Sequence, residues 1–250
     1  MKTTLLLSSF LGIALASSAA DSPKDAVKAA AKKLTDKGNY SYVSTAKFEG
    51  GGGGGGSRFT PGPTEGKVEG DVAVLKSTTG ENTTEAVVKG AKGVAKTQEG
   101  WRTAEEIRQS AQGGGGGKGG FVRGFAATRL ISNYKTPAAQ AAELADKATA
   151  LKEADGAISG ALPEATAREL MSFGGRGGGG GGQARQISGA KASVKFWLKD
   201  GMLSKYEITT EGSMSFNNND INLGRTTTVE IKDVGTTKAT IPEDAKARLQ

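Results

Sequence analysis

A two-residue alternation of apolar and polar side chains near the end of the chain constrains its fold more than any other feature. In SVKFWLKDGMLSKYEITTEGSMSF, residues 193 to 216, apolar residues recur at every second position on both sides of Asp200-Gly201. Such a period is typical of strands with one buried face. Asp-Gly between two such segments predicts a hairpin. The segment therefore predicts long antiparallel strands that share one apolar face.

The length of the loop at Asp200-Gly201 decides which side chains share that face. A two-residue loop would pair Phe196 with Lys205 and mix the two faces. A three-residue loop with Gly201 in the left-handed conformation gathers the apolar residues of both strands on one face: Val194, Phe196, Leu198, Tyr206 and Ile208. We therefore expect a three-residue loop with a bulge at Gly201.

The rest of the chain predicts further strands and several helices. A helix is expected over residues 23–36, where Ser22 provides the cap and Pro23 the first position. Thr103 and Glu106 form a capping box that opens another helix. Further helices are expected at 121–134, from Pro137 to about Glu153, and at 163–173; strands are expected at 39–48, 66–70, 72–76, 84–89, 93–97 and 157–161.

A sheet that is apolar on one side must cover that side, and the helical residues 103–152 are the available cover. The expected fold class is therefore α+β: a long, curved antiparallel β-sheet, or half-barrel, with an N-terminal helix and inserted helices on its concave face. The space between sheet and helices is either a filled core or an apolar pocket. The sequence leaves both open.

The first twenty residues read as a secretory signal peptide. Lys2 precedes an apolar core from Leu5 to Ala16, and small residues follow up to Ala20. The apolar core is shorter than the roughly 20 residues that a membrane span needs. Since the chain has no Cys, a lipid anchor on that residue is impossible. We expect an exported, soluble periplasmic or extracellular protein.

Three glycine tracts interrupt the remaining residues 21–250. They lie at 50–56, 113–120 and 174–182. Glycine runs do not bury enough surface to offset the entropy of ordering and behave as flexible coil. We therefore expect one domain with three flexible loops, and a monomer.

Two absent residue types narrow the chemistry. The chain has no His and no Cys, which removes the commonest general base, thiolate chemistry and nearly every zinc site. The formal net charge is +7, but the basic residues are dispersed. A dispersed excess favours solubility and weak attraction to anionic surfaces over nucleic-acid binding. We expect no cofactor, no metal and no nucleic-acid partner.

The order of elements and the C-terminal motifs resemble a known superfamily. FWLKDGMLSKYEI, an aromatic-aliphatic strand followed by Asp-Gly-x-Leu and Lys-Tyr, precedes TTTVEIKDVGTTKATIPEDA, a last strand that ends in Ile-Pro. This pattern resembles the LolA/LppX-like superfamily of exported bacterial lipid and lipoprotein carriers, in particular its uncharacterised secreted members. The resemblance implies an open curved sheet closed by helices that hold acyl chains. It implies no particular functional residue.

The candidate ligand-binding residues are aromatic side chains and one cation. Those expected to line a pocket are Tyr40, Tyr42, Trp101, Phe121, Phe125, Phe196 and Tyr206. Arg123, like Arg129, lies on the helix expected at 121–134, where it could meet an anionic headgroup. The competing interpretation is that the aromatic residues are core and the arginines face solvent.

Three functions from different classes follow. The first is a non-enzymatic exported protein that binds an apolar or acyl ligand between sheet and helices. The second is a structural or interaction protein of the cell envelope, with a solid core and a basic surface. The third is a hydrolase or transferase that uses carboxylates alone, which would require two carboxylates in one cleft. We expect the first, and therefore no catalytic residues.

Overall fold

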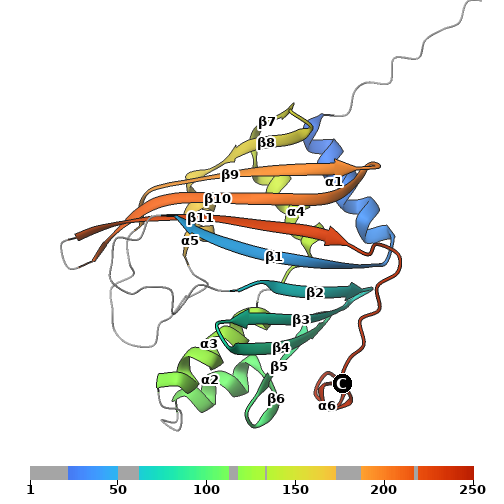
Figure 1. Cartoon of the computed structure of the whole chain (residues 1–250), viewed down its shortest axis with the longest axis vertical. Helices are drawn as coiled ribbons and strands as arrows, with labels where there is room; N and C mark the ends of the chain where they lie inside the picture. The colour runs from blue at the N-terminus through green and yellow to red at the C-terminus, as the bar shows by residue number, and fades with distance from the viewer. Residues whose placement is uncertain (1–21, 50–61, 113–117, 133, 173–186, 217–218) are drawn as a thin grey trace, which may run out of the picture.

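A computed structural model describes residues 22–49, 62–112, 118–132, 134–172, 187–216 and 219–250 (Figure 1). The predicted signal peptide and the glycine tracts at 50–56 and 174–182 lie outside these ranges. So do residues 113–117 of the second tract.

Helix α3 begins at Lys118, so the prediction of flexible coil is wrong for residues 118–120. Each helical glycine costs up to about 1 kcal/mol, a cost that packing of α3 against α2 and β5 offsets.

Eleven strands of the described residues form one open antiparallel sheet, in the order β6-β5-β4-β3-β2-β1-β11-β10-β9-β8-β7. Two meanders therefore meet where β1 pairs with β11. The strands are β1 (Asn39–Glu49), β2 (Thr64–Glu69), β3 (Val72–Thr79), β4 (Asn82–Lys89), β5 (Lys92–Thr97), β6 (Gly100–Thr103), β7 (Thr149–Ala154), β8 (Ala157–Leu162), β9 (Ile187–Lys199), β10 (Met202–Phe216) and β11 (Asn219–Lys232). The prediction of a large antiparallel sheet combined with helices is confirmed.

Six helices accompany the sheet in the described ranges: α1 (Pro23–Asp36), α2 (Ala104–Gln112), α3 (Lys118–Ser132), α4 (Pro137–Lys147), α5 (Glu164–Met171) and α6 (Glu243–Lys246). Ser22 caps α1 as predicted, because its hydroxyl accepts from the amide of Asp25. The predicted capping box of α2 is also present: Glu106 accepts from the Thr103 amide, and Thr103 accepts from the Glu106 amide.

One face of the sheet, called the inner face below, carries the main apolar core. Its alternate strand residues, such as Tyr40, Leu75 and Val194, pack with buried residues of helices α1, α4 and α5. Helices α1 and α4 pack on each other, and α1 also contacts β9 and β10. Helices α2 and α3 pack together and lie against β4 and β5, towards the other end of the sheet (Figure 1).

The opposite face, the outer face, has a second and smaller apolar cluster, the outer cluster. Val87 and Val94 point to this face, and Trp101 joins them from β6. Ala245 and Leu249 from the last residues of the chain cover them. The segment after β11 therefore crosses the outer face and buries its own small core there.

Two predictions are wrong at hairpin turns: one about the end of a helix and one about the length of a loop. The helix expected to reach Glu153 ends at Lys147, and residues 149–154 form β7 instead. The cause is the turn at Asp155-Gly156, where both residues have positive φ, 52° and 70°. That is the type I′ geometry that Asp-Gly favours, and it pairs β7 with β8.

The loop between β9 and β10 has two residues, where three were predicted. Asp200 and Gly201 have φ of 53° and 69°, and Lys199 pairs with Met202. The register then shifts between Leu203 and Lys205. This bulge inside β10 brings Phe196 opposite Tyr206, so the predicted shared face is confirmed although the predicted loop is wrong.

Candidate functional site

The four tyrosines of the chain interact beneath the first turn of α4. Tyr40 and Tyr42 project from the inner face of β1, and Tyr206 projects from the same face of β10. Tyr134 lies between α3 and α4 and brings its hydroxyl to 3.5 Å from that of Tyr42. This group, called the tyrosine cluster below, joins the middle of the sheet to α4.

The hydroxyl of each tyrosine that projects from a strand has a polar neighbour. The Tyr206 hydroxyl donates to Oε1 of Gln140 on α4 at 2.5 Å. The Tyr40 hydroxyl accepts from the amide of Ala138, also on α4, at 3.5 Å. Since Thr136 caps α4 and Pro137 occupies its first turn, the local sequence sets where this helix meets the tyrosines.

Burial raises the pKa of every tyrosine in the cluster. It raises the pKa of Tyr42 to about 12, and the pKa of Tyr206, the most buried of the four, well above its ordinary value. The pKa values of Tyr40 and Tyr134 are raised for the same reason. The four side chains are therefore neutral phenols at physiological pH. They suit hydrogen bonding in an apolar interior and are unsuited to act as bases.

A close backbone approach fixes the ring of Tyr42. Gly66 on β2 lies opposite Tyr42 in the sheet register. A Cβ atom at Gly66 would lie only 2.1 Å from Cε1 of the tyrosine ring. The ring therefore packs closely on the backbone at Gly66, where any side chain would overlap it.

The inner face becomes progressively exposed along β1. Tyr40 and Tyr42 are 2% and 6% exposed, Ser44 and Ala46 are half-buried, and Phe48 is 43% exposed. Among the side chains whose burial the structure describes, Phe48 is the only large apolar one that is exposed. The inner face thus runs from a buried aromatic end to an exposed aromatic residue.

A basic side chain lies beside this exposed end. Arg225 on β11 is paired with Phe48 on one side and with Thr210 of β10 on the other. Its guanidinium donates to the carbonyl of Leu170 on α5 at 2.7 Å. Burial, and to a smaller extent the charge of Arg129 on α3, lower the pKa of Arg225. Arg225 is therefore a partly desolvated cation beside Phe48.

The predicted ligand-binding residues divide into three groups. Tyr40, Tyr42, Tyr206 and Phe196 belong to one apolar core, and the rings of Phe196 and Tyr206 lie 6.3 Å apart at 41°. Trp101 is not with them, because the pairing of β6 with β5 places it on the outer face. Phe121, Arg123 and Phe125 fall on helix α3 as predicted, but their side chains lie outside the described part of the structure.

Sequence reasoning missed four residues of this region. Tyr134 and Gln140 were missed because they belong to the loop before α4 and to α4 itself, whose contact with β1 is not local. Phe48 ends the strand predicted at 39–48, but the sequence gave no sign of its exposure. Arg225 interrupts the apolar alternation of β11 between Leu223 and Thr227, and that interruption was the available signal.

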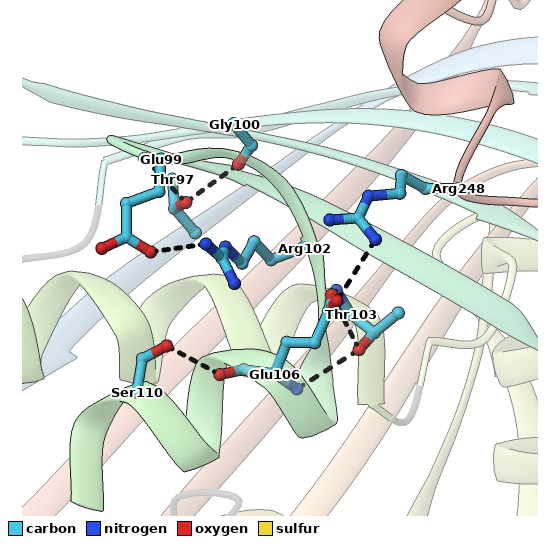
Figure 2. A network of polar contacts seen from close by, with 8 residues as sticks. All are labelled: Thr97, Glu99, Gly100, Arg102, Thr103, Glu106, Ser110 and Arg248. Atoms are coloured by element: carbon cyan, nitrogen blue, oxygen red, sulfur yellow. Dashed lines mark hydrogen bonds and ion pairs between the residues drawn. The ribbon is translucent and has the colours of Figure 1, made fainter. Parts of the chain in front are cut away.

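A polar network ties the outer cluster to helix α2 (Figure 2). Arg248, near the end of the chain, reaches Oε1 of Glu106 at 3.2 Å, while the other carboxylate oxygen of Glu106 completes the capping box. Arg102 forms an ion pair with Glu99 at 2.8 Å in the turn before β6. The contact between Arg248 and Glu106 links the segment that buries Trp101 to a helix that packs near the inner face.

The described residues contain no cluster of three acidic side chains placed to hold a metal ion. Within the same ranges, no helix combines the length and the apolar character that crossing a membrane would require. The chain matches no protein-family model, and a search of curated proteins gives no significant match.

Proposed function

We propose that the protein is an exported, non-enzymatic binding protein whose ligand is apolar or carries an acyl chain. In this proposal the sheet is a half-barrel, and the ligand lies on its concave inner face between the helices. The observation that carries it is the gradient of exposure along β1, from Tyr42 to Phe48. We interpret the exposed aromatic residue that continues this buried apolar face as the open end of a groove for an apolar ligand.

The arrangement of the helices supports this location. Helix α1 packs on β9 and β10, and α4 packs on α1 and reaches Tyr40 of β1 and Tyr206 of β10 with its first turn. The pair α2 and α3 packs against β4 and β5. Strands β1, β2 and β11 lie between these two groups in the sheet order. We propose that these central strands form the floor of the ligand site and that the tyrosine cluster forms its closed end. The resemblance to exported lipid carriers is consistent with this arrangement.

The carboxylates support a role without catalysis. Where the pKa of a described carboxyl group is shifted, it is lowered: Arg108 lowers that of Glu105, the Thr103 amide lowers that of Glu106, and Lys135 with Lys147 lowers that of Glu143. A general acid that uses a carboxyl group needs a raised pKa instead. These glutamates therefore behave as partners in surface ion pairs.

Mass spectrometry of organic extracts tests the proposal. We expect protein purified from its own envelope without detergent to carry a stoichiometric apolar or acyl molecule. The variant Phe48→Asp should lose this molecule while remaining folded. Thr45→Asp is the matched control, because it adds the same charge to the opposite face of the same strand. Wild-type protein without any bound molecule, or equal loss from both variants, would contradict the proposal.

A second candidate function is interaction with anionic polymers of the cell envelope. Two ammonium groups lie close to the ring of Trp197 on the outer face, with Lys205 Nζ 3.7 Å and Lys195 Nζ 5.0 Å from its centroid. This aromatic and cationic patch favours an anionic surface. Binding to such a polymer that weakens with salt, in protein that contains no extractable ligand, would favour this function over the first.

A further inference from the structure

The segment after β11, residues 233–250, is called the strap below. Two of its backbone amides bond to the first strands of the sheet: that of Gly235 donates to the Asn39 carbonyl at 3.0 Å, and that of Ala239 donates to Oε2 of Glu69 at 2.8 Å. From there the strap runs past the ends of β2 and β3 to α6, which contacts β6 (Figure 1). The strap therefore joins β1 to the far edge of its meander.

The last residues of the strap pack on two elements at once. Ala245 and Leu249 are buried in the outer cluster together with Trp101 of β6. Arg248, which precedes Leu249, reaches Oε1 of Glu106 on α2 at 3.2 Å (Figure 2). Because β6 leads directly into α2, these contacts hold both sides of one junction.

The strap acts on the first turn of α2 through Glu106. One oxygen of this carboxylate accepts from the Thr103 amide at 2.8 Å, and the Glu106 amide in turn bonds to the Thr103 hydroxyl. A carboxylate in the first turn also interacts favourably with the helix dipole. Since Arg248 holds the other oxygen, its ion pair positions the side chain that caps the helix.

Helix α2 depends on such contacts. It has nine residues, fewer than the roughly 12 that an isolated helix needs in water. Among its side chains that the structure describes, only Ile107 is buried. Ile107 packs on α3, where a Cβ at Gly124 would lie 3.2 Å from its Cγ2. A short helix with few buried side chains belongs to the less stable parts of a fold, so contacts at its first turn matter for its order.

We propose that the strap is a latch for α2. When Leu249 and Arg248 are seated, α2 is held against α3, which packs on β4 and β5. When they leave, α2 loosens before the rest of the fold. The inference rests on the proposed function in one respect: α2 and α3 form one wall of the proposed ligand site, so release of the latch should speed the exchange of ligand.

Hydrogen exchange of the whole protein, followed by mass spectrometry, tests the latch. Leu249→Ala should speed exchange in α2 about tenfold or more, because it removes a buried anchor of the strap. Arg248→Gln should speed it about twofold to fivefold, as expected for a partly exposed ion pair. Exchange in α4, which packs on α1, should stay unchanged. Lys246→Ala, at an exposed position of the strap, is the control and should leave α2 unchanged.

A change in α2 tests the coupling from the other side. Glu106→Gln keeps an oxygen for the Thr103 amide, since glutamine also completes a capping box, but it loses the charge that Arg248 meets. It should therefore speed exchange in strap residues 243–250, and combining it with Arg248→Gln should add little. A general loss of stability would instead speed exchange in α2, α4 and the strap equally.

The ligand part of the inference is measured with N-phenyl-1-naphthylamine, a neutral apolar dye that fluoresces in apolar sites. Its dissociation should be about threefold or more faster from Leu249→Ala than from wild-type protein. Lys246→Ala should release the dye at the wild-type rate.

The possible failures are distinct. If exchange in α2 is unchanged in Leu249→Ala and Arg248→Gln, or rises equally throughout the protein, the latch is overturned while the proposed function stands. If α2 loosens but the dye leaves at the wild-type rate, the strap does not regulate the ligand site, and the inference is overturned in that respect. If wild-type protein neither binds the dye nor carries an apolar molecule when purified, the proposed function fails, and hydrogen exchange alone decides on the latch.

Discussion

The tyrosine cluster shows what burial does to individual side chains. Four phenols share the interior near α4, and in each the pKa is raised chiefly by loss of water. The hydroxyl of Tyr206 is matched by an amide oxygen of Gln140, so its burial leaves no unsatisfied donor. Tyr42 and Tyr134 rely on each other at 3.5 Å, which is long for two hydroxyls.

We predict that none of the four tyrosines ionises separately near pH 10. The charged phenolate is the form that burial disfavours, so the folded protein holds these protons more tightly than the unfolded chain does. This contribution to the free energy of unfolding is complete below pH 10, the ordinary tyrosine pKa, and is lost as the pH rises towards about 12, the pKa of Tyr42. Absorbance at the phenolate band and circular dichroism should therefore change together during an alkaline titration.

The same titration in concentrated urea is the control, and there the four tyrosines should ionise together at their ordinary pKa. A tyrosine that ionises in this range while the circular dichroism remains native would show that its hydroxyl is not buried as described.

Gly66 gives a second prediction at this scale. The added methyl group of Gly66→Ala would overlap the Tyr42 ring, so we expect the free energy of unfolding to fall by about 1–3 kcal/mol. In a Tyr42→Ala background the ring is gone, and the same substitution should cost much less. Urea denaturation of the four proteins measures the coupling. Equal costs in the two backgrounds would be inconsistent with the contact.

At the scale of elements, hairpin turns decide two features of the sheet. Both type I′ turns have Asp-Gly at their centre, with positive φ at both residues. The dipeptide at 200–201 was recognised in the sequence but was given the wrong loop length. The dipeptide at 155–156 was overlooked because the alanine-rich residues before it favour a helix. In both places the geometry of the turn decides the pairing of the strands.

We predict that Gly156→Ala weakens the β7–β8 hairpin. A methyl group there would meet no other atom, so the cost reflects the positive φ alone and should be about 1 kcal/mol. Asp155→Asn is the matched control, since asparagine tolerates the left-handed region, and its effect should be close to zero. Urea denaturation measures the free energies of unfolding. A larger loss from Asp155→Asn than from Gly156→Ala would contradict this account of the turn.

At the scale of the whole molecule, the pairing of β1 with β11 completes the sheet from two separate meanders. Each meander could be predicted from alternation and short turns. The pairing between residues almost two hundred positions apart could not, because nothing in either strand alone specifies its partner. Trp101 was misplaced for a related reason. Its burial depends on Ala245 and Leu249, four positions apart near the end of the chain, whose contact with β4–β6 follows only from the complete fold.

The outer cluster therefore predicts a coupling between the end of the chain and the environment of Trp101. The protein has two tryptophans, so Trp197→Phe leaves Trp101 as the only one. Trp101 is 7% exposed, and its emission in this background should be that of a buried indole. Adding Leu249→Ala removes a buried side chain from the cluster. We expect a shift of the emission to longer wavelength and a loss of about 2 kcal/mol in the free energy of unfolding.

Lys246→Ala provides the comparison within the same segment. Lys246 is exposed, and its ion pair with Glu243 lies at the surface, so neither the emission nor the stability should change measurably. If Leu249→Ala behaved like Lys246→Ala, the last residues would not cover Trp101 in solution. If the emission shifts only with Leu249→Ala, the segment after β11 closes the outer face. Ligand binding on the inner face can then be measured separately, through Phe48.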